Sequence, residues 1–572
     1  MLSIPTLRTL IRRTYVLQVN GCGQRYRGNC VQAAVSKVGK MLQTFEDRVF
    51  QQIDRKYNSS IDYDKKISPD NKYYQINNKT ASKHNNNEQN IYQEYEEAVK
   101  ALNALQSNAE SLRSSIHKRK RLNSLQDTQR YLLKSGLTTK DLEKLSYIHV
   151  TGTKGKGSTC ALVDAILRSY KVKTGFYSSP HLVSVTERIR INGQPISKQK
   201  FNQYFWPVYN KLMETQEYEN DMPAYFKFLT VLSFHVYLGE KVDVVILEVG
   251  IGGELDCTNV VPNTKTVGIS SLGLEHTQLL GNTLKEIAWQ KAGIIKPHST
   301  VYTSVQQKEC LDVIYERAKE KQAVVHRVPE FESYFRDPSV EHVKKQLNNC
   351  TILNGSLALQ LAYDWLRQNC NGFHREYEVN KPQLTEQAIK GILNCNWPGR
   401  CQKVKFFNFN IHLDGAHTVE SMQVCGQWFS QVTADTAIPK ILLFNTTGDR
   451  DSEKLLTILR NFTTFDLVCF VPNIASLTKD KNQDNKSILY SYTEQLKRAQ
   501  MHATNWEKMC QEDKETNTGK VFPTIVESFQ HIRQVYNKSE ELNILVTGSI
   551  HLIGATILSL NELCPELNEE YK

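Results

Sequence analysis

The chain has 572 residues, with 71 Lys and Arg against 60 Asp and Glu. This length exceeds the roughly 250–300 residues at which one hydrophobic core stops growing, so we expect at least two domains. Seven of the basic residues lie within residues 1–45, which contain no acid, and the other 64 nearly balance the acidic ones. The body of the protein is therefore near neutral, and no basic patch interleaved with aromatics points to nucleic-acid binding.

The 13 cysteines are scattered from Cys22 to Cys564 without a C-x-x-C or paired spacing. This pattern indicates a reducing compartment and argues against a zinc site. No apolar run approaches the ~20 residues that span a bilayer, so we expect a soluble protein without a transmembrane segment.

Residues 1–45 predict a mitochondrial transit peptide, because LRTLIRRTYVL can form a basic amphipathic helix. A disordered basic tail is the alternative. Met41 lies near the end of this acid-free segment and before the first acid, Glu46. We hypothesise that initiation at Met1 gives a mitochondrial form, in the matrix or at the inner membrane, and that initiation at Met41 gives a cytoplasmic one.

Residues 46–91 are predicted to be a disordered insert. Tyr57 to Asn90 is rich in Asn, Lys and Ser, with too little apolar surface to offset the entropy lost on ordering. From Tyr92 the pattern becomes helical, and a second helix is expected from about Leu125 to Ser135. The apolar positions that indicate the first helix are Tyr95, Ala98, Val99, Leu102 and Leu105.

Residues 92–396 predict a central α/β domain with an open, mostly parallel sheet, in which ligands bind at the carboxyl ends of the strands. Apolar, β-rich runs alternate with helical ones. The expected strands are Tyr147–Val150, Val242–Leu247 and Thr266–Ile269, and the expected helices are Ser158–Lys171, Tyr225–Leu238 and Leu284–Ala292.

A Pro-Gly break from Trp397 to Arg400 precedes a second α/β series, so residues 397–572 predict a smaller C-terminal domain. Leu477 to about Thr524 is polar and irregular, which predicts a variable, mobile insert. The strands expected in this domain are Phe409–Leu413, Ile441–Phe444, Leu467–Val471 and Ile544–Val546.

The stretch TGTKGKGST, residues 151–159, lies between an expected strand and an expected helix. Glycines there allow backbone N–H groups to approach a phosphate, and a lysine can reach the outer phosphates. The ordinary G-x-x-x-x-G-K-[ST] pattern is not matched, because Gly157 separates Lys156 from Ser158. A glycine turn without a ligand is the alternative. The residues predicted to bind nucleotide are Gly152, Thr153, Lys154, Gly155, Lys156, Gly157 and Ser158.

A bound nucleotide requires a hard cation, and Mg²⁺ prefers oxygen ligands with several waters. Ser179, Glu248 and His276 stand at expected strand ends and are candidates for this ion. Glu248 ends the apolar run VDVVILE, and three glycines in four residues follow soon after it. A charged side chain at this position is hard to explain by packing. A lone histidine such as His276 is more often a core or surface residue.

Lys291 lies in an otherwise apolar helical stretch, where the alternative is a solvated lysine. Asp414 closes the strand FNFNIHLD, with His417 in the following turn. If the second domain folds over the first, Arg400 and Asp414 reach the nucleotide and His417 the reacting groups.

Together these motifs make the chain resemble the folylpolyglutamate synthases, the eukaryotic branch of the ATP-dependent Mur-type ligases. The resemblance runs from about Tyr92 to the C-terminus, apart from the 477–524 region and a weak patch around Arg327–Leu353. The segments that carry it are TGTKGKGST, SSPHLVSVTERIRINGQPIS, MPAYFKFLT, LEVGIGGELDCTN, LGLEHTQLLGNTLKEIAWQKAGI, NWPGR, LDGAH, LLFNTTGDRD and VTGSIHLIG.

The resemblance implies a P-loop-type ATPase domain, a Mur-ligase-like C-terminal domain and a reaction between them. A folate glutamate carboxylate would attack the γ-phosphate of ATP, and L-glutamate would displace phosphate from the acyl phosphate, a step of one-carbon metabolism. ATP and Mg²⁺ are the implied cofactors, with a monovalent cation such as K⁺ as a further candidate. Members of this family are commonly monomeric.

Site residues are also implied by the resemblance. Ser179, Glu248 and His276 would bind metal; Arg400 and Asp414 would contact the nucleotide. Lys156, Lys291 and His417 would be catalytic, with Lys291 matching a lysine that is carbamylated in related ligases. Folate would lie near residues 178–182, and glutamate near Ser549 and His551. The substrate residues expected are His181, Tyr225, Phe226 and Ser549.

Two positions depart from the family pattern. Glu275 stands where the family usually has Asp, and only Asn354 survives of a family segment at 349–362. Dihydrofolate synthase activity, alone or combined, stays open. A cell-wall Mur ligase would not need the MPAYF and SSPHL segments, and an inactive nucleotide-binding paralogue would have lost site residues that are intact here.

Overall fold

The computed structural model describes residues 74–106, 124–371, 373, 382–434, 437–448, 450–476, 484, 491–512, 519–537 and 541–563, without the side chains of 74–88 and 562. The chain divides into two compact units, residues 1–82 and 83–572, and nearly all of the described residues belong to the second. The predicted transit peptide and both start sites lie outside the described residues. None of the described helices is long and apolar enough to cross a membrane.

Within the described residues, eight strands form a first sheet in the order β4-β3-β2-β5-β1-β6-β7-β8. All neighbours are parallel except at β3 and β4. The strands are β1 Tyr147–Thr151, β2 Thr174–Tyr177, β3 Ile189–Ile191, β4 Gln194–Pro195, β5 Val244–Glu248, β6 Thr266–Ile269, β7 Thr300–Thr303 and β8 Val324–Arg327.

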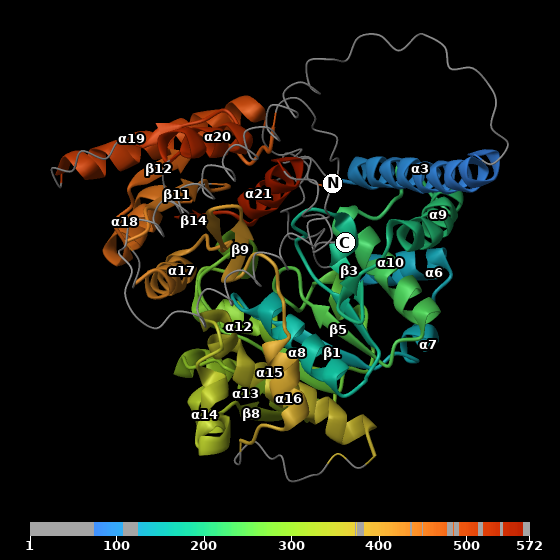
Figure 1. Cartoon of the computed structure of the whole chain (residues 1–572). Helices are drawn as coiled ribbons and strands as arrows, with labels where there is room; N and C mark the ends of the chain where they lie inside the picture. Colours follow the sequence, from blue (N-terminus) through green and yellow to red (C-terminus); the bar gives the residue numbers. More distant parts are fainter. Residues whose placement is uncertain are drawn as a thin grey trace, which may run out of the picture. The chain divides into compact units, whose positions relative to one another are not determined.

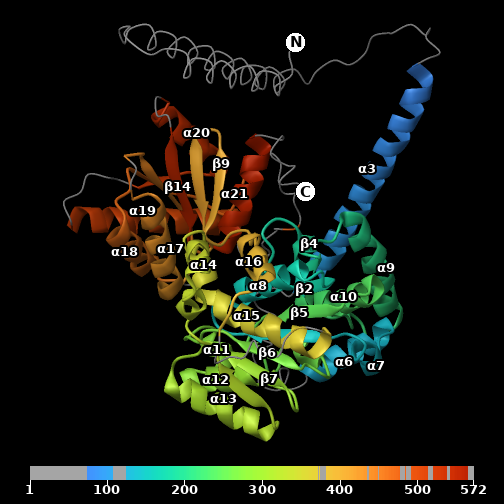
Figure 2. The ribbon, with the colours of Figure 1, turned by 60° about the horizontal axis from the view of Figure 1, so that its bottom comes forward.

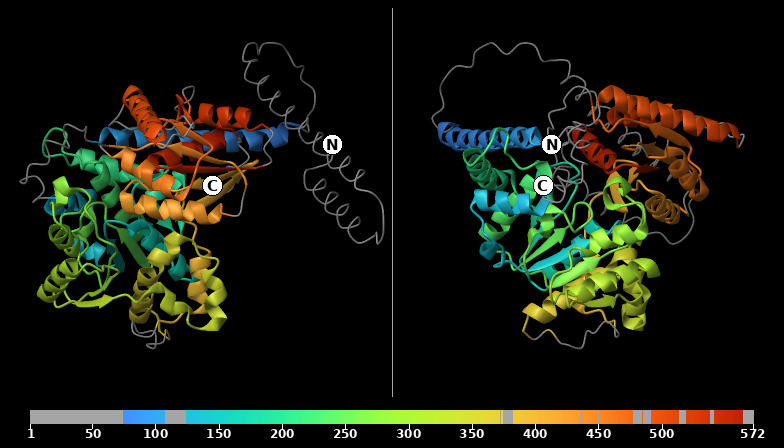
Figure 3. Two further views of the ribbon diagram at one scale, coloured as in Figure 1. Left: turned by 90° about the vertical axis from the view of Figure 1, so that its left-hand side faces the viewer. Right: turned by 180° about the vertical axis from the view of Figure 1, so that it is seen from behind.

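Helices cover both faces of this sheet (Figures 1 and 3). Alternate residues of β1 show why: Ile148 and Val150 pack into the core of one face, and Tyr147 packs into the other. The first face carries α8 Lys156–Ser169, α14 Pro338–Lys344, α15 Asn349–Asn369 and α16 Glu386–Leu393. The second carries α3 Tyr74–Ala104, α6 Ser124–Ser135, α9 Lys198–Glu214, α10 Tyr225–Glu240, α12 Leu284–Ala292 and α13 Lys308–Glu320. Shorter helices are α7 Thr139–Leu142 and α11 Thr277–Leu280, with 3₁₀ turns at Val185–Arg188, Cys257–Val260 and Phe331–Phe335.

A second sheet follows in the order β13-β12-β11-β14-β10-β9, parallel except for β9. Its helices again divide between the faces, α17 to α19 on one and α20 and α21 on the other (Figure 2). The elements are β9 Gln402–Phe406, β10 Phe409–Leu413, α17 Val419–Val432, β11 Lys440–Phe444, α18 Ser452–Phe462, β12 Leu467–Phe470, α19 Tyr492–Glu512, β13 Lys520–Val521, α20 Ile525–Val535, β14 Leu542–Thr547 and α21 Ile550–Leu563. The predicted fold class, an open and mostly parallel α/β sheet followed by a smaller α/β domain, is confirmed.

Two predictions of irregular structure are wrong in part. Helix α3 begins at Tyr74, inside the stretch predicted to be disordered. Helical hydrogen bonds are local, so a helix docked through Tyr95 and Leu102 can continue into a segment of polar sequence.

The predicted mobile insert at 477–524 contains the helix α19. Its polar composition obscured a buried stripe at helical spacing, in which Ala499, Ala503 and Trp506 pack into the core of the second sheet.

Candidate active site

The predicted site lies at the carboxyl edge of the first sheet. Strand β1 pairs in parallel with β5 and β6, so the ends of all three meet there. The phosphate loop follows β1, Glu248 ends β5, and Ser270, which follows β6, donates its N–H to Thr151 O at 2.8 Å. The chain forms β2 and β5 on one side of β1 and β6 on the other, so the strand order reverses here. Ligands usually bind at such a point in open α/β sheets.

The phosphate loop packs so tightly that only glycine fits at two positions. Gly152 and Gly155 have φ of +153° and +84°, in the region that favours glycine. A Cβ on Gly152 would lie 1.8 Å from Ser270 Oγ, and one on Gly155 would lie 2.1 Å from Asn354 Oδ1. Asn354, the one residue recognisable in its family segment, therefore braces the loop.

Helix α8 begins in this loop without a side-chain cap at Gly155. In contrast, α12 begins with a capping box between Thr283 and Glu286. The first N–H groups of α8 are thus available to an anion, and the helix dipole favours a negative charge there. Lys156 Nζ donates to Gly152 O at 3.0 Å and to Thr153 O at 3.3 Å, so the lysine lies over the loop.

Lys291 reaches the same loop from α12. Lys291 is 3% exposed, and its Nζ donates to Gly152 O at 2.7 Å. Burial, reinforced by the nearby charge of Lys156, lowers the pKa of Lys291 from 10.5 to about 7. At neutral pH a large fraction of this amine is therefore unprotonated and nucleophilic.

Glu248 is a buried carboxylate next to the phosphate loop. Its Oε2 accepts the Ser179 N–H at 3.0 Å, and it forms no ion pair among the described residues. A Cβ on Gly157 would lie 3.3 Å from both carboxylate oxygens, so the glycine keeps the loop close. Burial raises the pKa of Glu248, and a bound cation would offset the cost of its charge.

His276 lies at the start of α11 with a left-handed backbone, φ +52° and ψ +38°. Over the described ranges, no group of three or more His, Cys, Asp and Glu side chains lies close enough to hold a metal ion. Glu248 and His276 are therefore not part of an all-protein cage. A magnesium ion needs fewer protein ligands, because it retains several waters.

Glu275 connects the phosphate loop with the second sheet. Its Oε1 accepts from Lys154 Nζ at 2.9 Å and lies 3.6 Å from His417 Nε2. Lys154 Nζ is itself 3.2 Å from His417 Nε2. Although burial opposes it, the contacts with His417 and Lys154 hold the pKa of Glu275 well below its usual range. The structure thus brings His417 to the phosphate loop.

Asp414 and Arg400 lie next to each other at the end of β10. Asp414 accepts the N–H groups of Cys401 and Ala416 at 2.8 and 2.9 Å, and a Cβ on Gly415 would lie 2.4 Å from Arg400 Nη1. Burial raises the pKa of Asp414. These contacts fix the turn after β10 and, in the part of the chain that the structure describes, no hydrogen bond links them to the phosphate loop.

Two predicted substrate residues, His181 and Tyr225, contact Arg188, which the sequence reasoning did not single out. Arg188 Nε donates to His181 Nδ1 at 2.9 Å, and the guanidinium lies 5.4 Å from the centre of the Tyr225 ring. The Phe226 ring is 5.9 Å from that of Tyr177. The only signal for Arg188 was its place in the SVTERIRING segment.

Ser549 lies apart from this group, buried just before α21. Its Oγ accepts the His551 N–H at 3.2 Å. Among the described contacts, none joins Ser549 to a predicted site residue other than His551. Burial, followed by the charge of Arg188, lowers the pKa of His551 to about 4, so this end of the site is electrostatically linked to Arg188.

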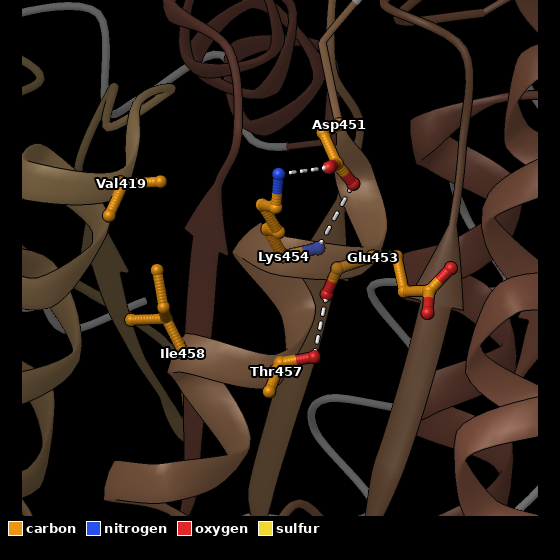
Figure 4. Close-up of a pocket in the computed structure, with 6 residues that line it drawn as sticks. All are labelled: Val419, Asp451, Glu453, Lys454, Thr457 and Ile458. Carbon is orange, nitrogen blue, oxygen red and sulfur yellow. Dashed lines mark hydrogen bonds and ion pairs between the residues drawn. The ribbon is translucent and has the colours of Figure 1, made fainter.

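A surface cavity of about 410 Å³ lies elsewhere, against α18 (Figure 4). Its polar groups satisfy one another: Asp451 accepts from the N–H and ammonium of Lys454, and the Thr457 hydroxyl donates to Glu453 O. No predicted site residue lines it, so it does not compete with the phosphate loop as the candidate site. Its lining residues are Val419, Asp451, Glu453, Lys454, Thr457 and Ile458.

Comparison with known proteins gives consistent relatives. The chain is 37% identical over 547 residues to the mitochondrial folylpolyglutamate synthase of Bos taurus, covering 81% of this chain and 92% of that protein. It is 41% identical over 448 residues to the mitochondrial folylpolyglutamate synthase of Homo sapiens, covering 73% and 74%. The fold is similar to that of Mycobacterium tuberculosis folylpolyglutamate synthase complexed with ADP and AMPPCP, with a TM-score of 0.57, 20% identity, and coverage of 77% and 95%. No family model matches the chain.

Proposed function

Because this chain belongs to the folylpolyglutamate synthase family, we propose that it is an ATP-dependent, ADP-forming ligase that adds L-glutamate in γ-linkage to tetrahydrofolate and its polyglutamates. The observation that carries the proposal is the meeting of Lys291, Glu248 and His417 at one phosphate loop. A general nucleotide-binding protein has no need for a buried lysine and a histidine from a second domain at that position.

The proposed reaction has two steps. A terminal glutamate carboxylate of the folate attacks the γ-phosphate of ATP, which forms an acyl phosphate and releases ADP. The amine of the incoming glutamate then attacks the acyl carbon and displaces phosphate. Both steps bring anions together, so they need fixed positive groups and N–H donors where charge develops.

The loop from Gly152 to Ser158, including Thr153, Lys154, Gly155 and Gly157, is proposed to hold the phosphates. Lys156 would move from the loop carbonyls to the outer phosphates, and Arg400 and Asp414 would contact the nucleotide. Support comes from the uncapped N-terminus of α8, which offers N–H groups to an anion.

Mg²⁺ is proposed to bind through Ser179, Glu248 and His276, with waters as further ligands. The donor set fits, because the buried Glu248 carboxylate forms no ion pair among the described side chains. When bound, the ion would neutralise charge on the phosphates. K⁺ is a further candidate cofactor that rests on the family resemblance.

Lys291 is proposed to be carbamylated, since its lowered pKa supplies the neutral amine that reacts with CO₂. The carbamate would add an anion able to orient a second Mg²⁺. His417 would act near the reacting groups, where Glu275 and Lys154 fix its ring.

Folate is proposed to bind against His181, Tyr225 and Phe226, the first two of which lie beside the Arg188 guanidinium. Ser549 is the candidate on the side of the incoming glutamate. Under this proposal both substrates would bind between residues 92–396 and 397–572, the two proposed domains. We further propose a monomer, located in mitochondria as the names of its relatives suggest, with a second cytoplasmic form from Met41.

The proposal is tested by ATP-dependent incorporation of labelled glutamate with tetrahydrofolate or dihydropteroate as acceptor. We expect incorporation and ADP release with tetrahydrofolate. Incorporation with dihydropteroate alone would instead assign dihydrofolate synthase activity, and activity with both acceptors would make the enzyme bifunctional. Absence of ADP release with either acceptor would reject the ligase assignment.

A further inference from the structure

The carboxylate of Asp221 is the centre of an ionic cluster whose cations, Arg130 and Lys134, are partly exposed. The Asp221 side chain is fully buried. Arg130 binds it with both terminal nitrogens, each at 2.8 Å, and Lys134 Nζ donates to it at 2.6 Å. The Tyr131 hydroxyl and the Glu217 N–H donate to it at 2.9 and 3.2 Å. We call Asp221, Arg130, Tyr131 and Lys134 the Asp221 clamp.

The clamp joins helix α6 to the loop between α9 and α10. Arg130, Tyr131 and Lys134 stand on adjacent turns of α6, and Asp221 stands in the loop that follows α9. The bidentate hydrogen bonds from Arg130 lead the contacts that hold the pKa of Asp221 well below its usual range. The loop is therefore fixed in position and direction, since a bidentate pair has little rotational freedom.

The segment fixed by the clamp leads directly to two proposed folate residues. Tyr225 and Phe226 begin α10, four and five residues after Asp221. The Tyr225 N–H donates to Leu105 O at 3.1 Å. A Cβ on Gly250 would lie 2.7 Å from the Phe226 ring, so this ring touches the loop that follows the strand of Glu248. A shift of this segment would therefore displace the Tyr225 and Phe226 rings relative to the proposed folate site.

A joint that served stability alone would not need this chemistry. Apolar residues of similar volume can often replace a buried ion pair without loss of stability, whereas in some proteins a buried ionic group selects one geometry. We propose that Asp221 is a positioning residue for the folate substrate: the Asp221 clamp fixes the segment from Asp221 to Phe226 and thereby sets the affinity for folate but not for ATP. This inference rests on the proposed function.

The test is steady-state kinetics of the full chain carrying Asp221→Asn. We expect the KM for tetrahydrofolate to rise about tenfold or more, because small displacements of positioning groups have effects of this size. The KM for ATP and the kcat at saturating folate should stay within about twofold of the unaltered enzyme. A purely structural role would leave the KM for tetrahydrofolate unchanged in the folded fraction or would alter both KM values together, and either result overturns the proposal.

Arg130→Lys is the second variant, because it keeps the charge and loses the bidentate geometry. It should raise the KM for tetrahydrofolate less than Asp221→Asn does. If neither variant folds, the clamp serves stability and the proposal is overturned. In a double-mutant cycle, Asp221→Asn and Phe226→Ala should be non-additive in their effect on this KM, and additive effects would contradict action through the segment.

The matched control is Glu240→Gln at the other end of α10. Glu240 accepts from Lys200 Nζ at 2.7 Å and from the Tyr204 hydroxyl at 3.3 Å, so it links α10 to α9, the two helices that the clamped loop connects, far from Tyr225. This variant should leave both KM values unchanged. Failure of the unaltered enzyme to incorporate glutamate rejects the proposed function, whereas an active enzyme with an unaffected Asp221→Asn variant rejects only this inference.

Discussion

Lys291→Ala should abolish activity and make it dependent on added short-chain carboxylic acid. The amine is buried, and its pKa falls from 10.5 to about 7. At pH 7 about half of the Lys291 amine is therefore neutral, whereas an ordinary lysine is neutral in about one molecule in 3,000. At 1.36 kcal/mol per pKa unit, this shift corresponds to a free-energy difference of about 5 kcal/mol between the two protonation states. This free energy measures how strongly the site favours the neutral amine, which is the form that CO₂ can carbamylate.

The same shift predicts a pH dependence with a definite sign. Below pH 7 the protonated, buried amine opposes both carbamate formation and folding. From pH 7 to 10.5 the unfolded chain binds the proton more strongly, so this group makes the free energy of unfolding increase with pH across that window. Carbamate labelling should therefore rise through a midpoint near pH 7.

Two measurements check the reasoning. With ¹³C-bicarbonate at pH 8, NMR should detect one carbamate that Lys291→Ala lacks, and acetate or propionate should restore part of the lost glutamate incorporation. Lys296→Ala is the matched control, because burial also lowers the pKa of that lysine, to about 8, while its Nζ donates to Asn259 O. Its activity should not respond to added acid. Absence of both the carbamate signal and the rescue would refute the role of Lys291.

Three further changes test other parts of the site and fold. Glu248→Gln should reduce activity at least about 100-fold while calorimetry without metal finds unchanged ATP affinity; an active variant would reject the metal site. Gly152→Ala should abolish ATP binding, because its Cβ would lie 1.8 Å from a serine hydroxyl, whereas Gly273→Ala, with 3.8 Å of space, should bind normally; equal affinities would contradict the tight loop. Trp506→Ala should lower the free energy of unfolding in urea by about 3–5 kcal/mol and Met501→Ala, at 48% exposure on the same helix, by less than about 0.5; similar losses would place Trp506 outside the core.

Local patterns predicted much of the fold. The expected strand at Thr266–Ile269 and helix at Leu284–Ala292 coincide with β6 and α12. Continuous apolar runs and the glycines of the phosphate loop carry this information in a few neighbouring residues. Helix α19 was missed because its buried stripe occupies a narrow face of an otherwise polar segment.

The site was harder to predict than the fold. Arg188 and Asp221 have no local feature that distinguishes them from surface charges, and their importance appears only from partners on other elements. Glu275 was noticed as a departure from the family, but its contacts with Lys154 and His417 were not foreseeable.

The sequence by itself determined that a phosphate loop sits between a buried strand and a helix, because glycine spacing and apolar periodicity are properties of adjacent residues. Only the tertiary structure decided which distant groups meet there. Lys291 reaches Gly152 across 139 residues, and His417 reaches Lys154 across 263. The strand order places β1 between β5 and β6, so their shared carboxyl edge, rather than proximity along the chain, brings Glu248 to the phosphate loop.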